Sequence, residues 1–398
     1  MPKVALPTSV KTLGWISFWA DVASELAYPI LPLFIVGTLS APSWSLGLME
    51  GLAGLVIAIL RLWSGIHSDK AGKRVPYIRW GYGISILAKP LVGLAISWPM
   101  VVVCRLADRV GKGIRTSSRD AFIAESVDPA LLGRAFGYHR MMDTAGAFVG
   151  VCIGAGLVWK YPSELRNILL LTAIPGFVAL GITFLIREPQ TNLSKAKSAL
   201  KLTLKLPREI WPVLGVLGLF GIANSSDTYL LLYAGLHGVA PFQVILLYAL
   251  FNLVYALASS PLGVLSDRIG SGKVLVGGWV LFGLSYLLFA RNVGLNLIPL
   301  FALYGLSVAA TDGISKAFLV KAGSKIPKGT LIGAQYFVIG ITTLVGNLIA
   351  GALWAKVSPE AMLYFGGILA LISSCALIFF LYRNNQLSVD ASANSLAG

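Results

Sequence analysis

The sequence predicts an all-α integral membrane protein, with twelve transmembrane helices in two six-helix bundles related by a pseudo-two-fold axis. Its composition, its long apolar stretches and a repeat between its halves support this prediction. Of the 398 residues, 56% are hydrophobic and only 12% are charged, and the mean hydropathy is +0.78. These values lie well outside those of soluble globular domains.

The predicted helices are the apolar stretches that lie between turn residues and clusters of charge. A hydrocarbon core about 30 Å thick needs about 20 apolar residues per helix, and twelve stretches are long enough. In chain order, the predicted spans are 11–38, 44–66, 77–98, 99–125, 133–158, 166–186, 210–237, 241–265, 273–290, 295–322, 330–356 and 359–382.

The basic residues determine the expected orientation. The net charge is +15, but most Lys and Arg residues fall in segments that face the cytosol if the amino terminus is cytoplasmic. This distribution follows the positive-inside rule, so the charge does not indicate a nucleic-acid partner. An even number of spans then places both termini in the cytosol. The first apolar stretch lacks a small-residue cleavage site, so we expect no signal peptide and a multi-pass location in the inner or plasma membrane.

The cysteines and histidines indicate neither a disulfide framework nor a metal site. The cysteines fall in predicted spans without metal-type spacing, and the histidines are far apart. These residues are Cys104, Cys152, Cys375, His67, His139 and His237.

Two carboxylates lie one turn apart in the first predicted span. Asp21 and Glu25 would lie near the membrane midplane, where a carboxyl group can bind and release a proton as its neighbours rearrange. Asp227, in the seventh span, takes the place equivalent to Glu25. We therefore predict that these three carboxylates couple transport to protons. The alternative is that they neutralise Arg109 or Lys112 in fixed ion pairs.

The loop between the second and third spans carries a dense motif, Gly65-Ile-His-Ser-Asp69-Lys-Ala-Gly-Lys-Arg74. Asp69 can bond arginines or the positive amino end of a neighbouring helix, and Gly65 allows close approach. We expect Gly65, Asp69 and Arg74 to form a gate that favours the outward-facing state. Asp267 repeats the motif in a shorter form in the second half. The alternative is that these residues are topogenic charges and a turn.

The fourth predicted span carries a row of charge. Its members are Arg105, Asp108, Arg109, Lys112, Arg115, Arg119 and Asp120. Steps of three and four residues place the cations on one helix face. Each such charge near the bilayer centre costs about 3 kcal/mol, so the row must face protein or water.

The position along this span suggests two roles. We predict that the first four basic residues bind an anionic solute, because guanidinium groups hold carboxylate or phosphate bidentately. Arg119 and Asp120, nearer the cytosol, are expected to join Asp69 in the gate. The alternative is simple charge balance with the acidic residues of the spans.

The fifth predicted span carries small residues, Gly137, Gly146, Gly150 and Gly154. They form a surface on which a partner helix can pack closely, and a distinct antiport role is the alternative to packing alone. Tyr138 in this span and Asn224 in the seventh are further candidates for solute binding.

A basic, hydrophilic stretch divides the spans six and six. We predict an amino-terminal bundle over 1–186, a cytoplasmic linker over 187–209, a carboxyl-terminal bundle over 210–382 and a cytoplasmic tail over 383–398. In the second bundle we expect Asp312 and Lys316 to pair, because they lie four residues apart.

The two halves also resemble each other in sequence. Residues 18–25 align with 220–227, and Gly133 and Gly137 align with Gly329 and Gly333. Because each half has an even number of spans, the copies are parallel and related by an axis along the membrane normal.

On these motifs the chain resembles the major facilitator superfamily of secondary transporters, over nearly its whole length. The loop motif is close to the family's GxxxDRxGRR, with Lys70 where arginine is usual. Arg105 and the glycines after it are similar to the family's arginine-and-glycine motif. The glycines of the fifth span have the spacing of its antiporter motif, but Val151 replaces the proline and Ala155 the final glycine. In motifs the chain is nearest to the drug/proton antiporter branch.

The resemblance implies a proton-coupled secondary transporter that works by alternating access, with a solute site between the halves. The basic row favours a small anionic or zwitterionic organic solute, and export is favoured over import. The alternatives are transport of a lysolipid or other amphiphile, and exchange of multidrug cations for protons. We expect no enzyme activity, because no catalytic motif is found. We expect a monomer in contact with membrane lipid, with no cofactor and a proton or ion gradient as driving force.

Overall fold

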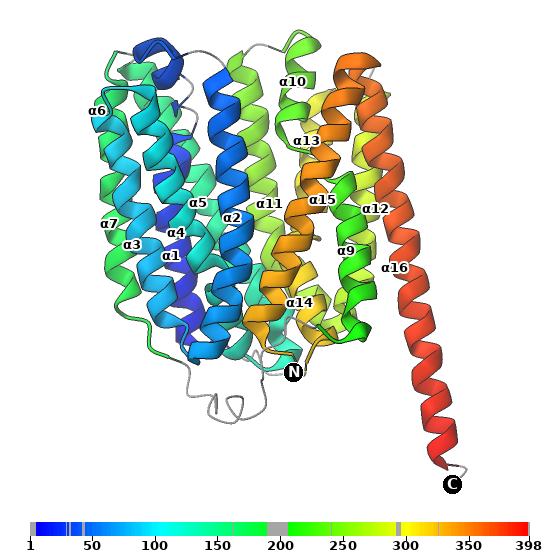
Figure 1. The fold of residues 1–398 in the computed structure, drawn as a ribbon. Helices are drawn as coiled ribbons and strands as arrows, with labels where there is room; N and C mark the ends of the chain where they lie inside the picture. The colour runs from blue at the N-terminus through cyan, green and yellow to red at the C-terminus, as the bar shows by residue number, and fades with distance from the viewer. Residues whose placement is uncertain are drawn as a thin grey trace.

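The computed structural model describes residues 5–28, 30–31, 33–41, 44–161, 163–188, 206–239, 241–291, 296–324 and 326–396. Every regular element in these residues is a helix. Figure 1 shows the long helices running side by side, with the start of α1 and the end of α16 at the same end of the molecule. We call this end, at the bottom of Figure 1, the lower end.

The helices of the first half follow the predicted spans. They are α1 (Thr8–Ala27), the π-helix η1 (Leu33–Thr38), α2 (Trp44–Ala71), α3 (Val75–Leu91) with the 3-10 turn η2 (Val92–Leu94), α4 (Trp98–Glu125), the 3-10 turn η3 (Pro129–Leu131), α5 (Leu132–Lys160), α6 (Leu165–Leu171) and α7 (Ala173–Thr183). Prolines occupy the first turns of α3 and α4, where a missing N–H breaks no helical bond.

The second half repeats this order. Its elements are the 3-10 turn η4 (Arg208–Ile210), α9 (Trp211–Ala223), α10 (Thr228–Leu236), α11 (Pro241–Ile269), α12 (Ser271–Ala290), α13 (Leu297–Ala309), α14 (Asp312–Ala322), α15 (Lys328–Lys356) and α16 (Pro359–Leu396). Gly270, with a φ of 98°, makes the tight turn between α11 and α12, a conformation that glycine adopts without strain.

Several spans that the sequence predicts as unbroken are interrupted. The first span divides between α1 and η1, the sixth at Thr172, the seventh between α9 and α10, and the tenth between α13 and α14. At the seventh, Asn224 leaves the helical conformation, and Asn347 on α15 accepts a hydrogen bond from the freed backbone N–H of Ser226 at 2.8 Å. Such breaks persist in a membrane only where side chains satisfy the backbone.

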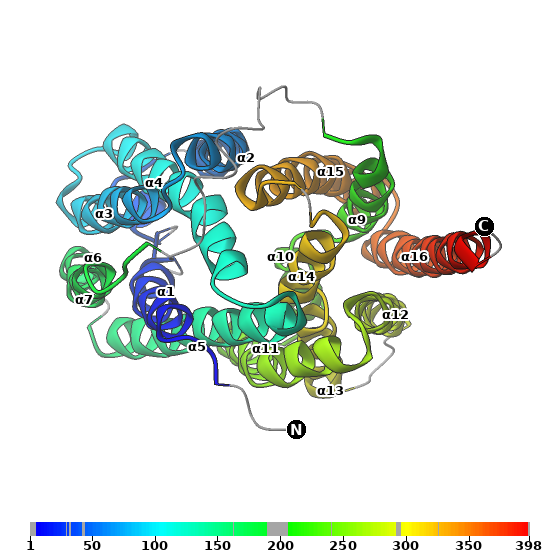
Figure 2. The ribbon, with the colours of Figure 1, turned by 90° about the horizontal axis from the view of Figure 1, so that it is seen from below.

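The helices form two bundles. Seen from the lower end, α1 to α7 lie on one side and α9 to α16 on the other (Figure 2). The bundles meet where α2 packs on α15 and where α5 packs on α11 and α14. This is the two-bundle arrangement that the sequence predicts.

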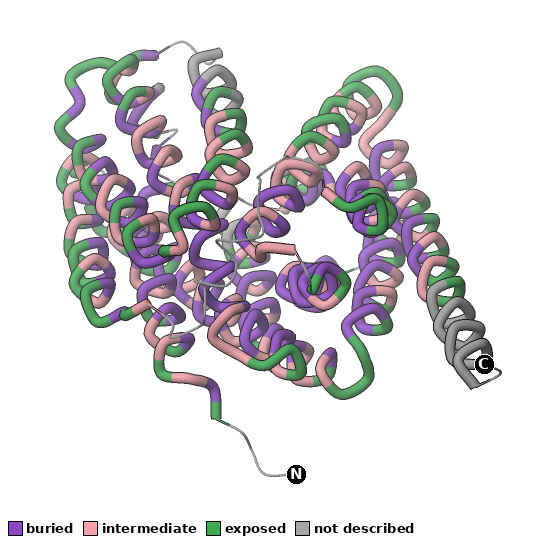
Figure 3. The backbone as a smooth tube through the Cα atoms, turned by 60° about the horizontal axis from the view of Figure 1, so that its bottom comes forward, coloured by how far each residue is buried: buried purple, intermediate pink, exposed green. Residues whose placement is uncertain are grey.

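The pattern of burial is that of a membrane protein. Figure 3 shows exposed residues along the outer sides of the helices and buried residues inside. Many exposed residues are large and apolar, for example Trp80, Leu257 and Phe379. Eight helical segments of the described chain are long and apolar enough to cross a membrane. The charged helix α4 is not among them.

The predicted linker over 187–209 lies mostly outside the described residues, which stop at 188 and resume at 206. The limits proposed for the two bundles, the linker and the tail therefore stay a prediction. In the structure, α16 continues as a helix from the predicted twelfth span to Leu396.

Candidate functional site

A buried carboxylate on α4 organises part of the charged row. Lys89 on α3 lies 2.9 Å from one oxygen of Asp108, and the Ser85 hydroxyl donates to the same oxygen. Arg105 and Arg109 approach the other oxygen, at 3.7 and 3.6 Å. Three cations therefore converge on one buried carboxylate between α3 and α4.

The next two cations of the row have no acidic partner in the described residues. The ammonium of Lys112 forms no hydrogen bond or ion pair there. The opposite charges that act on it are those of Asp21 and Glu25, on α1. Arg115 stacks its guanidinium 3.9 Å from the ring centroid of Tyr82, and its Nε and Nη1 have no hydrogen-bond partner. The row is thus divided, with Arg115 packed against α3 and Lys112 acting on α1.

A pair of carboxyl groups, Asp21 on α1 and Asp143 on α5, joins these helices. The two carboxyl groups lie close enough to act on each other electrostatically. Two neighbouring carboxylates repel each other when both are ionised, so such a pair favours holding one proton. Asp143 also accepts a hydrogen bond from the Ser17 hydroxyl at 2.5 Å. We call Asp21 and Asp143 the proton pair.

Glu25 lies one turn beyond Asp21 on α1. Its Oε2 is buried and accepts no hydrogen bond from any described residue. Lys112, Arg109 and Arg105 are the cations that act on it. The alternative prediction is that Glu25 forms a fixed ion pair, and the described residues contain no such pair. The coupling role of Glu25 stays a prediction.

The proton pair is connected to the second bundle through Arg140. This arginine lies 2.5 Å from Asp143 on its own helix and also forms an ion pair with Asp312 on α14. The Tyr255 hydroxyl on α11 donates to the same Asp312 carboxylate at 2.7 Å. We call the contact between Arg140 and Asp312 the bridge. Asp143, a member of the proton pair, therefore contacts the arginine that forms the ion pair between the bundles.

A second polar contact between the bundles is centred on Asp120, which is fully buried. Arg119 lies 2.9 Å from one of its oxygens, and Lys316 on α14 lies 2.9 Å from the other. The Tyr336 hydroxyl on α15 donates to it at 2.6 Å.

This cluster corrects two expected contacts. Lys316 is expected to pair with Asp312, but each finds a partner in the first bundle instead: Asp312 pairs with Arg140 and Lys316 pairs with Asp120. Arg119 and Asp120 do not join Asp69 in the described residues, because they pair with each other deeper in the molecule. They still connect the bundles, and their gating role stays a prediction.

The second half contributes a smaller polar group at the break between α9 and α10. Tyr304 on α13 donates a hydrogen bond to Asp227, the residue that precedes α10. Ser225 and the Tyr286 hydroxyl are 3.0 Å apart. Asn224 lines a cavity inside the second bundle. No cation pairs with Asp227 in the described residues, so the two halves are unequal in charge.

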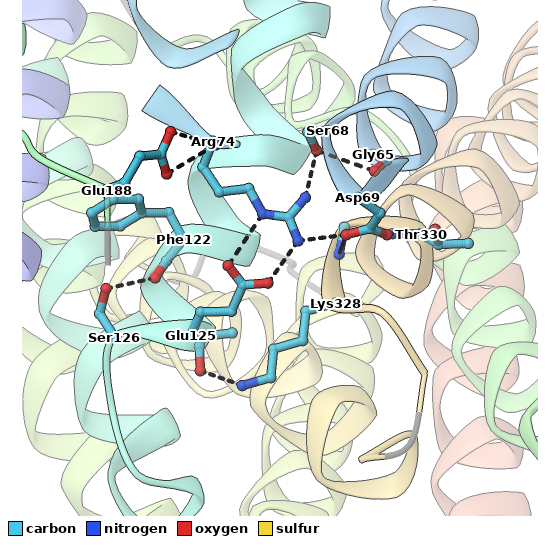
Figure 4. A network of polar contacts seen from close by, with 12 residues as sticks. Gly65, Ser68, Asp69, Arg74, Phe122, Glu125, Ser126, Glu188, Lys328 and Thr330 are labelled. Carbon is cyan, nitrogen blue, oxygen red and sulfur yellow. Dashed lines mark hydrogen bonds and ion pairs between the residues drawn. The ribbon is translucent and has the colours of Figure 1, made fainter. Parts of the chain in front are cut away.

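At the lower end, Asp69 joins the first bundle to the second (Figure 4). It accepts hydrogen bonds from the backbone N–H groups of Gly329 at 3.2 Å and Thr330 at 2.5 Å, and from the Thr330 hydroxyl at 2.5 Å. These groups begin α15, where the helix dipole favours a negative charge. A Cβ on Gly65 would overlap the Gly329 carbonyl oxygen, so glycine is needed for this approach. We call this contact the first latch.

Arg74 stabilises the first latch from within the first bundle. Its guanidinium, 1% exposed, pairs with Asp69 and lies 2.6 Å from Glu125 at the end of α4. Burial alone lowers the pKa of Arg74, but the hydrogen bond with Glu125 and the charges of Asp69 and Glu125 raise that pKa above its ordinary value. Glu188 accepts hydrogen bonds from the backbone N–H groups of Arg74 and Val75 and so holds the start of α3.

The second latch repeats the first at the other contact between the bundles. Asp267, near the end of α11, accepts hydrogen bonds from the N–H groups of Gly133 at 2.9 Å and Arg134 at 2.7 Å, at the start of α5. Lys321 on α14 lies 3.1 Å from its carboxylate. The two bundles are therefore bonded at two symmetric places of the lower end.

Sequence reasoning singled out Asp21, Asp69 and Asp267, but it gave Arg140 and Asp143 no role and paired Asp312 with Lys316 instead of Arg140. The three-residue spacing of Arg140 and Asp143 was a signal that could have been read. Tyr138 packs beside Gly14 at the contact of α1 and α5. The bridge could not be read from the sequence, because it depends on the packing of α5 on α14.

Comparisons with known proteins agree with this architecture. The family model of the Major Facilitator Superfamily matches residues 13–245 and 228–395. The chain belongs to the major facilitator superfamily. It is 37% identical over 382 residues to an uncharacterized MFS-type transporter of Methanocaldococcus jannaschii, covering 94% of this chain and 95% of the relative.

The chain is also similar to the multidrug resistance protein MdtG of Enterobacter lignolyticus. The two are 30% identical over 289 residues, which cover 68% of this chain and 67% of MdtG. Among solved structures, the superfamily transporter FucP in the outward conformation matches with a TM-score of 0.73. The identity is 15%, with 94% of this chain and 98% of FucP covered.

Membership of the superfamily defines the chain as an integral, multi-pass membrane transporter with the twelve-helix, two-bundle fold, and not an enzyme. In that fold the contacts between the bundles are the places that change as a solute crosses. The proton pair, the bridge and the latches all lie at, or one residue from, those contacts.

Proposed function

We propose that the protein is a proton-coupled secondary transporter that moves a small anionic or zwitterionic organic solute by alternating access, with export favoured. The observation that carries this proposal is the proton pair, since the carboxyl groups of Asp21 and Asp143 act on each other and Asp143 also forms an ion pair with Arg140. Arg140 in turn pairs with Asp312 in the other bundle.

The proton pair supplies a coupling mechanism. When Asp143 is ionised, it attracts Arg140 and competes with Asp312 for the same guanidinium. A second proton on the pair would remove that competition and strengthen the bridge. Proton binding therefore changes the free energy of a contact between the bundles, which is what coupling requires.

The charges of the first bundle support an anionic or zwitterionic solute. Lys112 and Arg115 have no acidic partner in the described residues, and buried cations without partners attract anions. Glu25 lies beside Lys112 and can accept the proton when the solute leaves. Asp227 and Asn224 line the opposite bundle, where they are proposed to contact the solute and the proton.

The latches support a state closed at the lower end. We propose that this end faces the cytosol, in agreement with the positive-inside rule, and that the structure represents the outward-facing state of a plasma-membrane monomer. Gly65, Asp69, Arg74, Asp267, Arg119 and Asp120 are the proposed gating residues. Export is favoured because MdtG bears the name of a multidrug resistance protein.

Exchange of organic cations for protons is the second candidate. The MdtG relationship and the buried carboxylates of α1 favour it. The unpaired cations next to these carboxylates weaken it, because they would repel a cationic solute.

The proposal can be tested with purified protein in proteoliposomes. A thermal-shift screen with organic anions, zwitterions and cations, such as benzoate, glutamate and ethidium, identifies a solute for flux assays. Asp21→Asn should abolish accumulation driven by a pH gradient and retain solute exchange. The asparagine side chain keeps the size and polarity of Asp21, but it can no longer bind or release a proton.

Glu209→Gln is the matched control, because Glu209 is an exposed carboxylate of η4 outside the network. It should accumulate solute as the wild type does. If Asp21→Asn keeps its gradient-driven accumulation, the proton pair does not couple transport. Stabilisation by ethidium alone would favour the cation exchanger.

A further inference from the structure

A partly open cavity lies inside the second bundle, beside the bridge. A cavity of about 160 Å³ lies between α9, α12, α13, α14 and α15, at the level where α9 and α13 are interrupted. Its walls include Phe220, Trp279, Phe282, Asn224 and Asp312. It is separate from the cation row, which lies in the other bundle.

Aromatic rings form one wall of this cavity. Phe220 and Trp279 stack nearly parallel, with ring centroids 4.6 Å apart and an interplanar angle of 5°. Phe282 meets Phe220 edge-on, at 5.1 Å and 73°. These rings are buried and held by one another, so the wall is preformed. A space of about 150 Å³ with apolar walls is known to accept one benzene molecule.

The same wall contains a hydrogen-bond donor without a partner. Trp279 is fully buried, and its indole Nε1–H meets no acceptor in the described residues. A buried indole N–H normally finds an acceptor, because leaving it unpaired costs free energy. A ring with an acceptor atom that reaches Nε1 would satisfy it.

The cavity is connected to the contact between the bundles through Asp312. This residue lines the cavity and pairs with Arg140 of the first bundle. Its side chain is 32% exposed, which leaves the cavity accessible on this side. A group bound in the cavity would therefore lie against the carboxylate of the bridge.

We propose that this cavity binds a single six-membered aromatic ring that carries a hydrogen-bond acceptor. The proposal rests on the proposed function, in that the ring is the apolar part of the transported solute. The solute class is thereby narrowed to aromatic organic acids or zwitterions, with the ring in the second bundle and the charge towards the first.

The test uses nicotinamide as a neutral aromatic probe and acetamide as its ringless counterpart. Binding is measured by saturation-transfer-difference NMR, without a pH gradient, on the full protein in lipid nanodiscs. Wild-type protein should give saturation transfer to nicotinamide and none to acetamide. Equal signals for the two probes would overturn the proposal.

Two substitutions locate the site. Ile339→Phe places a ring in the cavity that Ile339 lines and should weaken nicotinamide binding at least tenfold, whereas Ile341→Phe, on the outer side of the same helix with 46% exposure, should leave it unchanged. Trp279→Phe keeps the stacked ring but removes the donor, and should weaken binding about tenfold. If Ile339→Phe and Trp279→Phe bind nicotinamide as the wild type does, the cavity is not the site.

These outcomes are independent of proton coupling. Loss of gradient-driven flux in Asp21→Asn leaves the binding measurement unaffected. Conversely, flux that persists in a protein without nicotinamide binding overturns this inference and leaves the proposed function standing.

Discussion

The two latches have the same hydrogen-bond arrangement but different surroundings. In each, an aspartate near the end of a helix accepts bonds from the first N–H groups of a helix in the other bundle, Asp69 at α15 and Asp267 at α5. The first latch also holds a buried arginine. The second has Lys321, whose side chain is 30% exposed.

This difference shows that two contacts with the same backbone geometry can stabilise the closed lower end by different amounts. A buried hydrogen bond to a charged group contributes more free energy to the closed lower end than a partly exposed ion pair, because water screens the exposed pair. Lys328 adds a further contact only at the first latch, where its ammonium donates to the Ala124 carbonyl at 2.6 Å. We therefore expect the first latch to determine most of the stability of the closed lower end.

The largest effect is expected for Asp69→Asn. It removes the charge that faces the α15 amino terminus and leaves Arg74 with one acidic partner fewer. Charge-assisted bonds of this kind contribute about 1.5 to 3 kcal/mol each, so the ratio of closed to open lower end should fall about 100-fold.

This ratio can be measured by double electron–electron resonance. Spin labels are placed at the exposed residues Ala71 and Ala322, at the ends of α2 and α14, in a cysteine-free background. Asp128→Asn, an exposed carboxylate at the same end, is the control and should not change the distances. An unaltered distance distribution for Asp69→Asn would show that this latch does not hold the closed state.

A smaller effect is expected for Asp267→Asn. The two backbone bonds are retained in part by the amide oxygen, and no buried arginine loses a partner. The ratio should fall about tenfold, the equivalent of one charged hydrogen bond. The same spin labels report it. A fall as large as that of Asp69→Asn would mean that the two latches stabilise the closed lower end equally.

The smallest effect is expected for Lys321→Ala. A half-exposed ion pair contributes about 0.5 kcal/mol, so the ratio should change less than threefold, and less still at high salt. Lys273→Ala, an exposed lysine on α12, provides the matched control. A tenfold change in the ratio would show that Lys321 is as important for the second latch as Arg74 is for the first.

Much of the candidate site was predictable, because its parts are encoded locally. Gly65 and Asp69 follow from a short motif, and the internal repeat aligns Gly133 with Gly329, the two residues that the latches bind. Asp21 stands out as a carboxylate in an apolar span. The bridge was not predictable, because Arg140 and Asp312 lie far apart in the chain and meet only through the packing of α5 on α14.

The sequence by itself determined the membrane location, the twelve spans, the parallel repeat and the superfamily, because hydropathy and motif spacing are properties of contiguous segments. The tertiary structure decided which charges meet. Arg119 pairs with Asp120 and not Asp69, Lys316 pairs with Asp120 and not Asp312, and the seventh and tenth spans are interrupted. Ion pairs inside a membrane depend on three-dimensional neighbours, since each buried charge must find a partner on whichever helix packs against it.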